Sequence, residues 1–112
     1  MLFRSLKISD IIDEKILNKN CGKFGDKLSG GQKQMVQLIR AYLSDAHIIL
    51  LDEPTSAIDP IHKKHIVKMI KFLIKNKQVI MVTHDWSLIK NFKRVIKIDN
   101  GKIEFDKKIN KN

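Results

Sequence analysis

Apolar residues recur at helical spacing in three segments of this 112-residue chain. The first segment spans residues 9–20, the second begins at Gly30, and the third begins at Asp59-Pro60 and ends near Lys75-Asn76. In the second segment the apolar positions follow an i, i+3, i+4, i+7, i+8 series, which is typical of a buried helix face: Met35, Leu38, Ile39, Tyr42 and Leu43. The third segment repeats this spacing at Ile66, Met69, Ile70 and Leu73. The pattern predicts three helices, and Asp59 with Pro60 suits the start of the third.

Short β-branched runs lie between and after these helices. Ile48–Leu51 and Gln78–Thr83 are predicted strands, and the first is expected to be buried on both faces. Asp85–Phe92 is a predicted short helix, and the segments flanking Asn100-Gly101 form a predicted hairpin over Arg94–Phe105. This order of elements predicts an α/β fold with a mostly parallel sheet and an antiparallel C-terminal hairpin.

Composition and charge narrow the class of protein. With 43% hydrophobic and 30% charged residues, the chain is typical of one soluble globular domain. Its longest apolar runs have four residues, whereas a membrane span needs about 20. The single cysteine, Cys21, excludes an internal disulfide and favours a reducing compartment. The net charge of +10 comes mostly from scattered lysines without an arginine cluster, which favours solvated helix faces over nucleic-acid binding. His62 and His65 lie on such a lysine-rich helix, and a solvated face is favoured over a metal site because a metal would need further ligands.

Two segments carry the candidate chemistry. Leu28–Gln32 places Ser29, Gly30 and Gly31 at the start of a predicted helix, where exposed N–H groups bind anions and the glycines allow a phosphate to approach closely. The alternative is a flexible loop that contains two glycines. In the second segment, Asp52 and Glu53 follow a predicted buried strand, at the edge where open α/β sheets bind ligands.

The two acids can hold different roles, since one can ligate a hard cation while the other polarises a water. A solvated acidic turn is the alternative, which Pro54 and Thr55 weaken because they fix the turn. His84 follows the next predicted strand, so it is expected near the same rim of the sheet. A histidine alone is a weak indication of function, because it is more often structural. His84 becomes informative because it is the third such feature along the chain, after Leu28–Gln32 and the acidic pair.

These segments resemble those of the ATP-binding cassette (ABC) ATPases. Leu28–Gln32 is similar to the signature motif and Ile48–Glu53 to the Walker B strand, while Ser56–Asp59 resembles the D-loop and His84 the switch histidine. The resemblance implies that Ser29, Gly30, Gly31 and Gln32 face the γ-phosphate of an ATP held by the opposing subunit. It further implies that Asp52 holds Mg²⁺ through water, Glu53 is the general base, His84 senses the γ-phosphate, and Asp59 communicates across the dimer.

The family's first lobe is not found in these residues. No glycine precedes Gly22, and no G-x-x-x-x-G-K-[ST] loop occurs. The chain therefore resembles the C-terminal half of a nucleotide-binding domain with a partial P-loop NTPase-like fold. By this resemblance residues 1–44 are a remnant of the α-helical subdomain with the signature helix, 45–106 are the core lobe, and 107–112 are a tail.

The resemblance implies an ATP-binding subunit fragment of an ABC transporter, with ATP and Mg²⁺ as cofactors. The expected partners are a Walker A-bearing half or a second nucleotide-binding domain, and a transmembrane subunit that holds the chain at the cytoplasmic side of a membrane; no nucleic acid is expected. Two alternatives remain: an ATPase head fragment of the structural-maintenance or DNA-repair type, and a catalytically silent regulatory fragment. The long heptad repeats of the structural-maintenance type are absent from this sequence. The presence of both Asp52 and Glu53 argues against a catalytically silent fragment.

Overall fold

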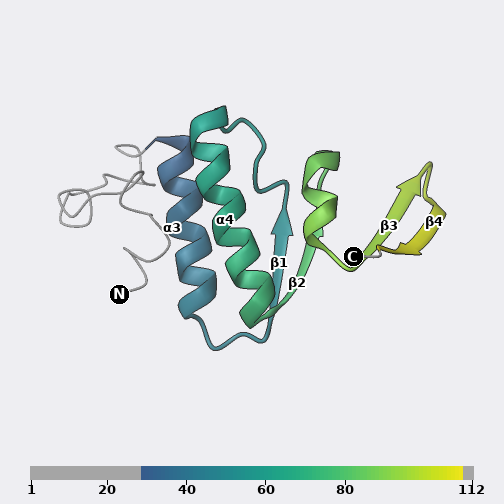
Figure 1. The fold of residues 1–112 in the computed structure, drawn as a ribbon, viewed down its shortest axis with the longest axis horizontal. Coiled ribbons are helices and arrows are strands. Elements are labelled where there is room, and N and C mark those ends of the chain that lie inside the picture. The colour runs from purple at the N-terminus through teal and green to yellow at the C-terminus, as the bar shows by residue number, and fades with distance from the viewer. Residues whose placement is uncertain (1–28, 110–112) are drawn as a thin grey trace. The chain divides into compact units, whose positions relative to one another are not determined.

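The computed structural model describes residues 29–109, which form two compact units (Figure 1). The first unit ends at Val82 and the second begins at Thr83, so the lobe predicted over residues 45–106 spans both. The helix predicted over residues 9–20 lies outside the described residues. Within residues 29–109, no helix is both long enough and apolar enough to cross a membrane.

Helix α3, Gly30–Leu43, forms as its apolar spacing predicts. Ser29 is its N-cap, and Gly31, Met35 and Leu38 are buried. The prediction that Leu43 lies on this face is wrong: it is the last residue of the helix and is 69% exposed.

Helix α4, Pro60–Asn76, has the predicted start and end. Its four apolar core residues are each at most 1% exposed: Ile66, Met69, Ile70 and Leu73. The helix packs against both α3 and β2, and near its C-terminal end the ring of Phe72 lies 4.9 Å from the ring of Tyr42. Burying four such side chains supplies much of the hydrophobic stabilisation of this unit, at about 1.5–3 kcal/mol each.

Strands β1, Ile48–Asp52, and β2, Gln78–Val82, pair in parallel from Ile48 opposite Gln78 to Asp52 opposite Val82. Figure 1 shows α3 and α4 together on one side of this pair, where Ile49 and Leu51 are buried. The prediction that β1 is buried on both faces is wrong. Its other face is open because, within the described part of the first unit, no helix covers it, and this leaves four apolar side chains 51–73% exposed: Ile48, Leu50, Ile80 and Val82.

The second unit begins with a short 3₁₀ helix, η3, Trp86–Asn91, where the sequence predicts a short helix. Asp85 caps it by accepting from the N–H of Ser87 at 3.0 Å. Strands β3, Arg94–Asp99, and β4, Lys102–Lys108, then form the predicted antiparallel hairpin as a sheet of its own. β4 extends to Lys108, two residues into the segment 107–112 that is predicted as a tail. The mixed α/β fold with a parallel pair and an antiparallel hairpin is confirmed.

Lys77 joins the C-terminal end of α3 to the segment that leads into β1. Its ammonium group donates to the carbonyls of Ala41 at 3.1 Å, Ser44 at 2.6 Å and Ala46 at 2.9 Å. The last carbonyls of a helix have no partner within the helix, and a cation is favoured near them. Lys77 therefore fixes the connection between α3 and β1.

We expect Lys77→Met to lower the free energy of unfolding by roughly 1–3 kcal/mol, because it keeps the apolar stem and removes three charged hydrogen bonds. Urea unfolding followed by circular dichroism measures the change. The matched control is Lys75→Met, two residues earlier and exposed, which should stay within about 0.5 kcal/mol of the wild type. Equal losses in both variants would contradict this role of Lys77.

Candidate functional site

The glycine turn, Ser29–Gln32, is a capping box at the start of α3. The Ser29 hydroxyl accepts from the N–H of Gln32 at 3.1 Å, and the Gln32 side chain accepts from the N–H of Ser29 at 3.0 Å. The first N–H groups of a helix have no partner within it. Since the N–H of Gln32 is capped by Ser29 and that of Lys33 bonds the Ser29 carbonyl, the N–H groups of Gly30 and Gly31 are those left to a ligand, among the residues that the structure describes.

The two glycines differ in their surroundings. A Cβ atom on Gly31 would lie 2.7 Å from both Cβ and Cγ of His62, which is closer than side chains tolerate. A Cβ atom on Gly30 would have its nearest neighbour at 3.8 Å, the Cδ1 atom of Ile58, which is an ordinary contact. Gly31 is therefore required where α3 and α4 approach each other, and Gly30 is not required by packing.

Asp59 is the N-cap of α4. Its carboxylate accepts from the N–H of Ile61 at 3.1 Å and from the N–H of His62 at 3.0 Å, and it also bonds the Nδ1 atom of the His62 ring. These bonds, first that from the His62 N–H and then that from its ring, lower the pKa of the Asp59 carboxyl below its usual 3.8. His62 bonds Asp59 and also lies against Gly31 of the glycine turn, so the prediction that it lies on a solvated face is wrong.

Asp52 and Glu53 lie at the C-terminal end of β1 in different settings. Asp52 ends the strand and is exposed. The N–H of Glu53 donates to the carbonyl of Val82 at 2.8 Å, and its own carbonyl accepts from the N–H of Ser56 at 3.1 Å, which begins a turn. Glu53 is half-buried and has a φ of 49°, in the left-handed region that non-glycine residues rarely occupy. The two carboxylates therefore leave the strand end in different backbone conformations.

The turn after Glu53 is anchored by burial. Pro54 is below 2% exposed and Thr55 is 8% exposed, so the turn is held against the first unit rather than solvated. The N–H of Ile58 donates to the carbonyl of Thr55 at 3.4 Å, and Ala57 has a φ of 59°. Two left-handed non-glycine residues within five positions mark a constrained loop, which joins the acidic pair to the cap at Asp59.

His84 belongs to the second unit, is exposed, and follows β2 by two residues. The N–H of Asp85 donates to the hydroxyl of Thr83 at 2.9 Å, which turns the chain toward η3. The first unit thus brings the glycine turn and Asp59 together through His62, and it holds Asp52 and Glu53 at one strand end.

Sequence reasoning missed His62. The signal available was its position three residues after the cap Asp59, where a side chain returns to the N-terminal turn of its helix, but nothing in the sequence indicates that α3 lies against it. Its contact with Gly31, about 30 positions earlier in the chain, depends on how α3 and α4 pack together.

The chain is similar to known proteins in sequence. The sequence pattern described as ABC transporter matches residues 2–56. The chain is 42% identical over 82 residues to an ATP-dependent lipid A-core flippase of Desulfotalea psychrophila, covering 73% of this chain and 14% of the flippase. It is 39% identical over 100 residues to a putative hemin import ATP-binding protein HrtA of Staphylococcus haemolyticus, covering 88% of this chain and 45% of HrtA.

The chain is also similar to a solved structure in its fold. The dimeric structure of MJ0796, a bacterial ABC transporter cassette, superposes with a TM-score of 0.73 at 31% identity, covering 98% of this chain and 46% of that one. The fold is therefore that of part of a P-loop NTPase cassette. The chain belongs to the ABC transporter family and corresponds to a portion of its nucleotide-binding domain, spanning less than half the length of each of these three relatives.

Gly31→Ala tests the close approach of α3 to α4. We expect it to lower the free energy of unfolding by about 1–3 kcal/mol, because the added methyl overlaps the side chain of His62. The matched control, Gly30→Ala, meets no atom closer than 3.8 Å and should be neutral or slightly stabilising. Thermal unfolding of both variants measures the difference, and a Gly31→Ala variant as stable as the control would contradict the packing.

The cap at Asp59 predicts a direction of pH dependence. The pKa of Asp59 is lowered in the folded state, so Asp59 stabilises the fold at pH values above its ordinary pKa of 3.8. That stabilisation is lost as the pH falls through the pKa of the folded state. NMR titration of the carboxyl carbons should find Asp59 below 3.8 in the wild type. His62→Ala should raise the pKa part of the way, since the two backbone donors stay, while Lys64→Ala should leave it unchanged. An unshifted Asp59 would contradict the cap.

Proposed function

We propose that this chain supplies the signature, Walker B, D-loop and switch-histidine segments of an ABC-type ATPase that couples ATP hydrolysis to transport across a membrane. The main support is that the glycine turn and Asp59 meet at His62 in one compact unit that also presents two carboxylates at the C-terminal end of a parallel strand pair. In the proposed assembly, the Walker A loop comes from a partner half or from a second nucleotide-binding domain.

The glycine turn is proposed to bind the γ-phosphate of an ATP held by the opposing subunit. The N–H groups of Gly30 and Gly31 are the donors for this phosphate, and the start of α3 adds the favourable end of the helix dipole. Ser29 and Gln32 hold each other in the capping box, so they fix the direction in which these N–H groups point. Asp59, fixed by its bonds to α4, is proposed to contact the same partner.

Asp52 and Glu53 are proposed to have different roles in ATP hydrolysis. Mg²⁺ takes one or two protein carboxylates with waters and phosphate oxygens, which fits the exposed Asp52. When bound, Mg²⁺ neutralises charge on the phosphates. Glu53, half-buried and held in its own turn, accepts the proton of the attacking water. His84 donates a hydrogen bond to a γ-phosphate oxygen.

The open face of the β1–β2 pair supports a partner half. Parallel strands are normally covered on both faces, and an apolar surface of this kind marks an interaction site. Asp52 ends the same face that exposes Leu50 and Val82, since alternate residues of a strand share a face. A lobe that covers this face therefore lies next to the proposed Mg²⁺ ligand. A transmembrane subunit completes the proposed transporter.

ATPase measurements on the 112-residue chain test this function. Alone, the chain should not turn over ATP, because it contains no G-x-x-x-x-G-K-[ST] loop. Mixed with a cassette half that carries this loop, taken from a relative such as MJ0796, it should hydrolyse ATP. Glu53→Gln should then reduce turnover by about 100-fold or more.

The matched control is Glu104→Gln, which removes an equal charge in the hairpin, where Glu104 pairs with Lys97 at 2.7 Å. This variant should keep wild-type turnover in the mixture. Hydrolysis of ATP by the chain alone, including hydrolysis that Glu53→Gln abolishes, would overturn the proposed function, and so would turnover by the mixture that Glu53→Gln leaves unchanged.

A further inference from the structure

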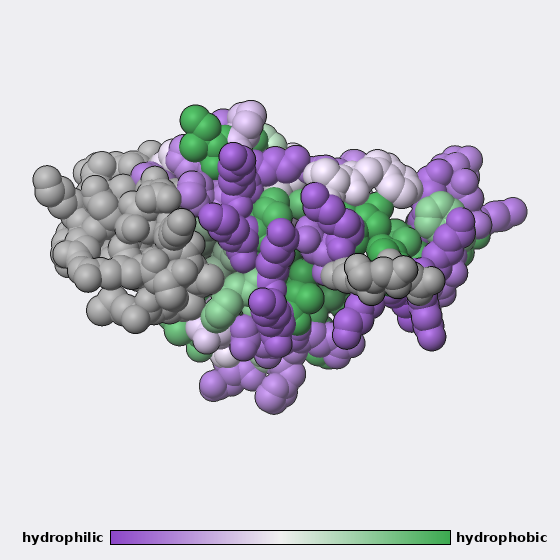
Figure 2. Space-filling model, in the orientation of Figure 1, coloured by the Kyte–Doolittle hydropathy of each residue, from purple (hydrophilic) through white to green (hydrophobic). Residues whose placement is uncertain are grey.

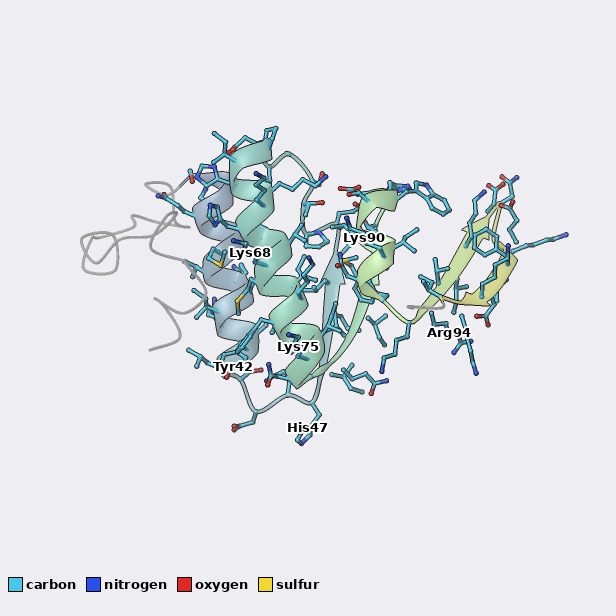
Figure 3. All side chains as sticks on the ribbon, viewed as in Figure 1. Tyr42, His47, Lys68, Lys75, Lys90 and Arg94 are labelled. Carbon is cyan, nitrogen blue, oxygen red and sulfur yellow. The ribbon has the colours of Figure 1, made fainter. Side chains whose placement is uncertain are left out.

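One face of α4 is lined by lysines. We call it the lysine face and define it by Lys64, Lys68, Lys71 and Lys75, all of which are exposed. With 3.6 residues per turn, these four positions fall within about 60° of one another around the helix, opposite the buried face of Met69 and Leu73. Figure 3 labels Lys68 and Lys75 along α4, and Figure 2 shows a band of hydrophilic residues over this helix.

Within residues 29–82, the helices α3 and α4 carry charge of one sign. α3 and α4 together hold seven lysine or arginine residues and no aspartate or glutamate. Residues 83–109 of the second unit also hold seven, but with four acidic residues, and ion pairs form there between Arg94 and Asp106 and between Lys97 and Glu104. Within residues 29–109, no ion pair involves a lysine of the lysine face.

Like charges three or four residues apart destabilise a helix. The lysine face places three such pairs in succession, which α4 tolerates because its opposite face is buried. An anionic partner would remove this repulsion. The lysine face spans about 16 Å along the helix axis, at 1.5 Å per residue, so the partner must present negative charge over a comparable length.

We propose that the lysine face of α4 is a contact surface for the anionic headgroups of a membrane. Lysine is depleted in protein–protein interfaces, which favour aromatic residues and arginine. The lysine face contains neither, and stacking or bidentate groups for nucleic-acid recognition are equally missing from it. Ile61, 73% exposed and at the edge of the same side of α4, adds an apolar side chain of the kind that enters a lipid interface. The choice of a membrane over other polyanions rests on the proposed transport function.

Vesicle binding by the full 112-residue chain without nucleotide tests the proposal. The chain should sediment with vesicles of 70% phosphatidylcholine and 30% phosphatidylglycerol, a probe composition on the order of the anionic content that polybasic segments require, and not with pure phosphatidylcholine. Binding should weaken as salt is raised. Exchanging all four lysines of the lysine face for glutamine should reduce the affinity by about 100-fold or more, at about fivefold for each lysine.

The matched control exchanges four exposed lysines of the second unit for glutamine: Lys90, Lys93, Lys102 and Lys108. It changes the net charge equally and should lower the affinity no more than about threefold. Circular dichroism verifies that both variants keep their helices, and the salt dependence of the wild type gives a second measurement that needs no variant.

Three results would overturn the proposal: equal binding of the wild type to both kinds of vesicle, equal losses in the two variants, or lysine-face-dependent binding to duplex DNA but not to anionic vesicles. Because no nucleotide is present, these results are independent of the ATPase measurements. A chain that binds vesicles but does not hydrolyse ATP in the mixture would contradict the proposed catalytic roles. It would still support the proposed membrane contact of the lysine face.

Discussion

The burial of one face of α4 is the constraint on which the rest of the first unit depends. α4 contacts both α3 and β2, and its core residues, from Ile66 to Leu73, are almost fully removed from water. Because the helix is fixed at its middle by this apolar contact, its two ends are fixed as well. Its N-terminal end brings Asp59 and His62 to the glycine turn, and just after its C-terminal end Lys77 reaches the last carbonyls of α3.

In this packing, Gly31 has a structural role in addition to its role in the proposed phosphate site. The glycine turn was expected to lack side chains so that a ligand can approach, but the structure shows that Gly31 makes room for His62. Gly30, which packing leaves unconstrained, is the glycine whose freedom is available to a ligand. One segment thus combines the packing of two helices with the start of α3, so the buried glycine that lies against His62 is also one of the two proposed phosphate donors.

Much of this fold was predictable from local patterns. The apolar spacing gave α3 and α4, Asp59-Pro60 gave the start of α4, and Asn100-Gly101 gave a turn in which both residues have the positive φ that a two-residue hairpin requires. Features that depend on distant segments were not predictable. The run Ile48–Leu51 has the same apolar character whether one face is covered or two, and the position of His62 in the sequence does not indicate that α3 packs against it.

The geometry of Asp52 and Glu53 is likewise only partly predictable from the sequence. Adjacent residues of a regular strand point to opposite faces, so the sequence predicts that Asp52 and Glu53 diverge, but not how. Glu53 leaves the strand with a φ of 49° while its N–H still bonds Val82, so the ladder continues for one residue as the chain turns away. The buried Pro54 and Thr55 then hold this uncommon conformation in place. A strained residue persists only where its surroundings fix it, so the division between an exposed and a half-buried carboxylate is built into the backbone before any nucleotide binds.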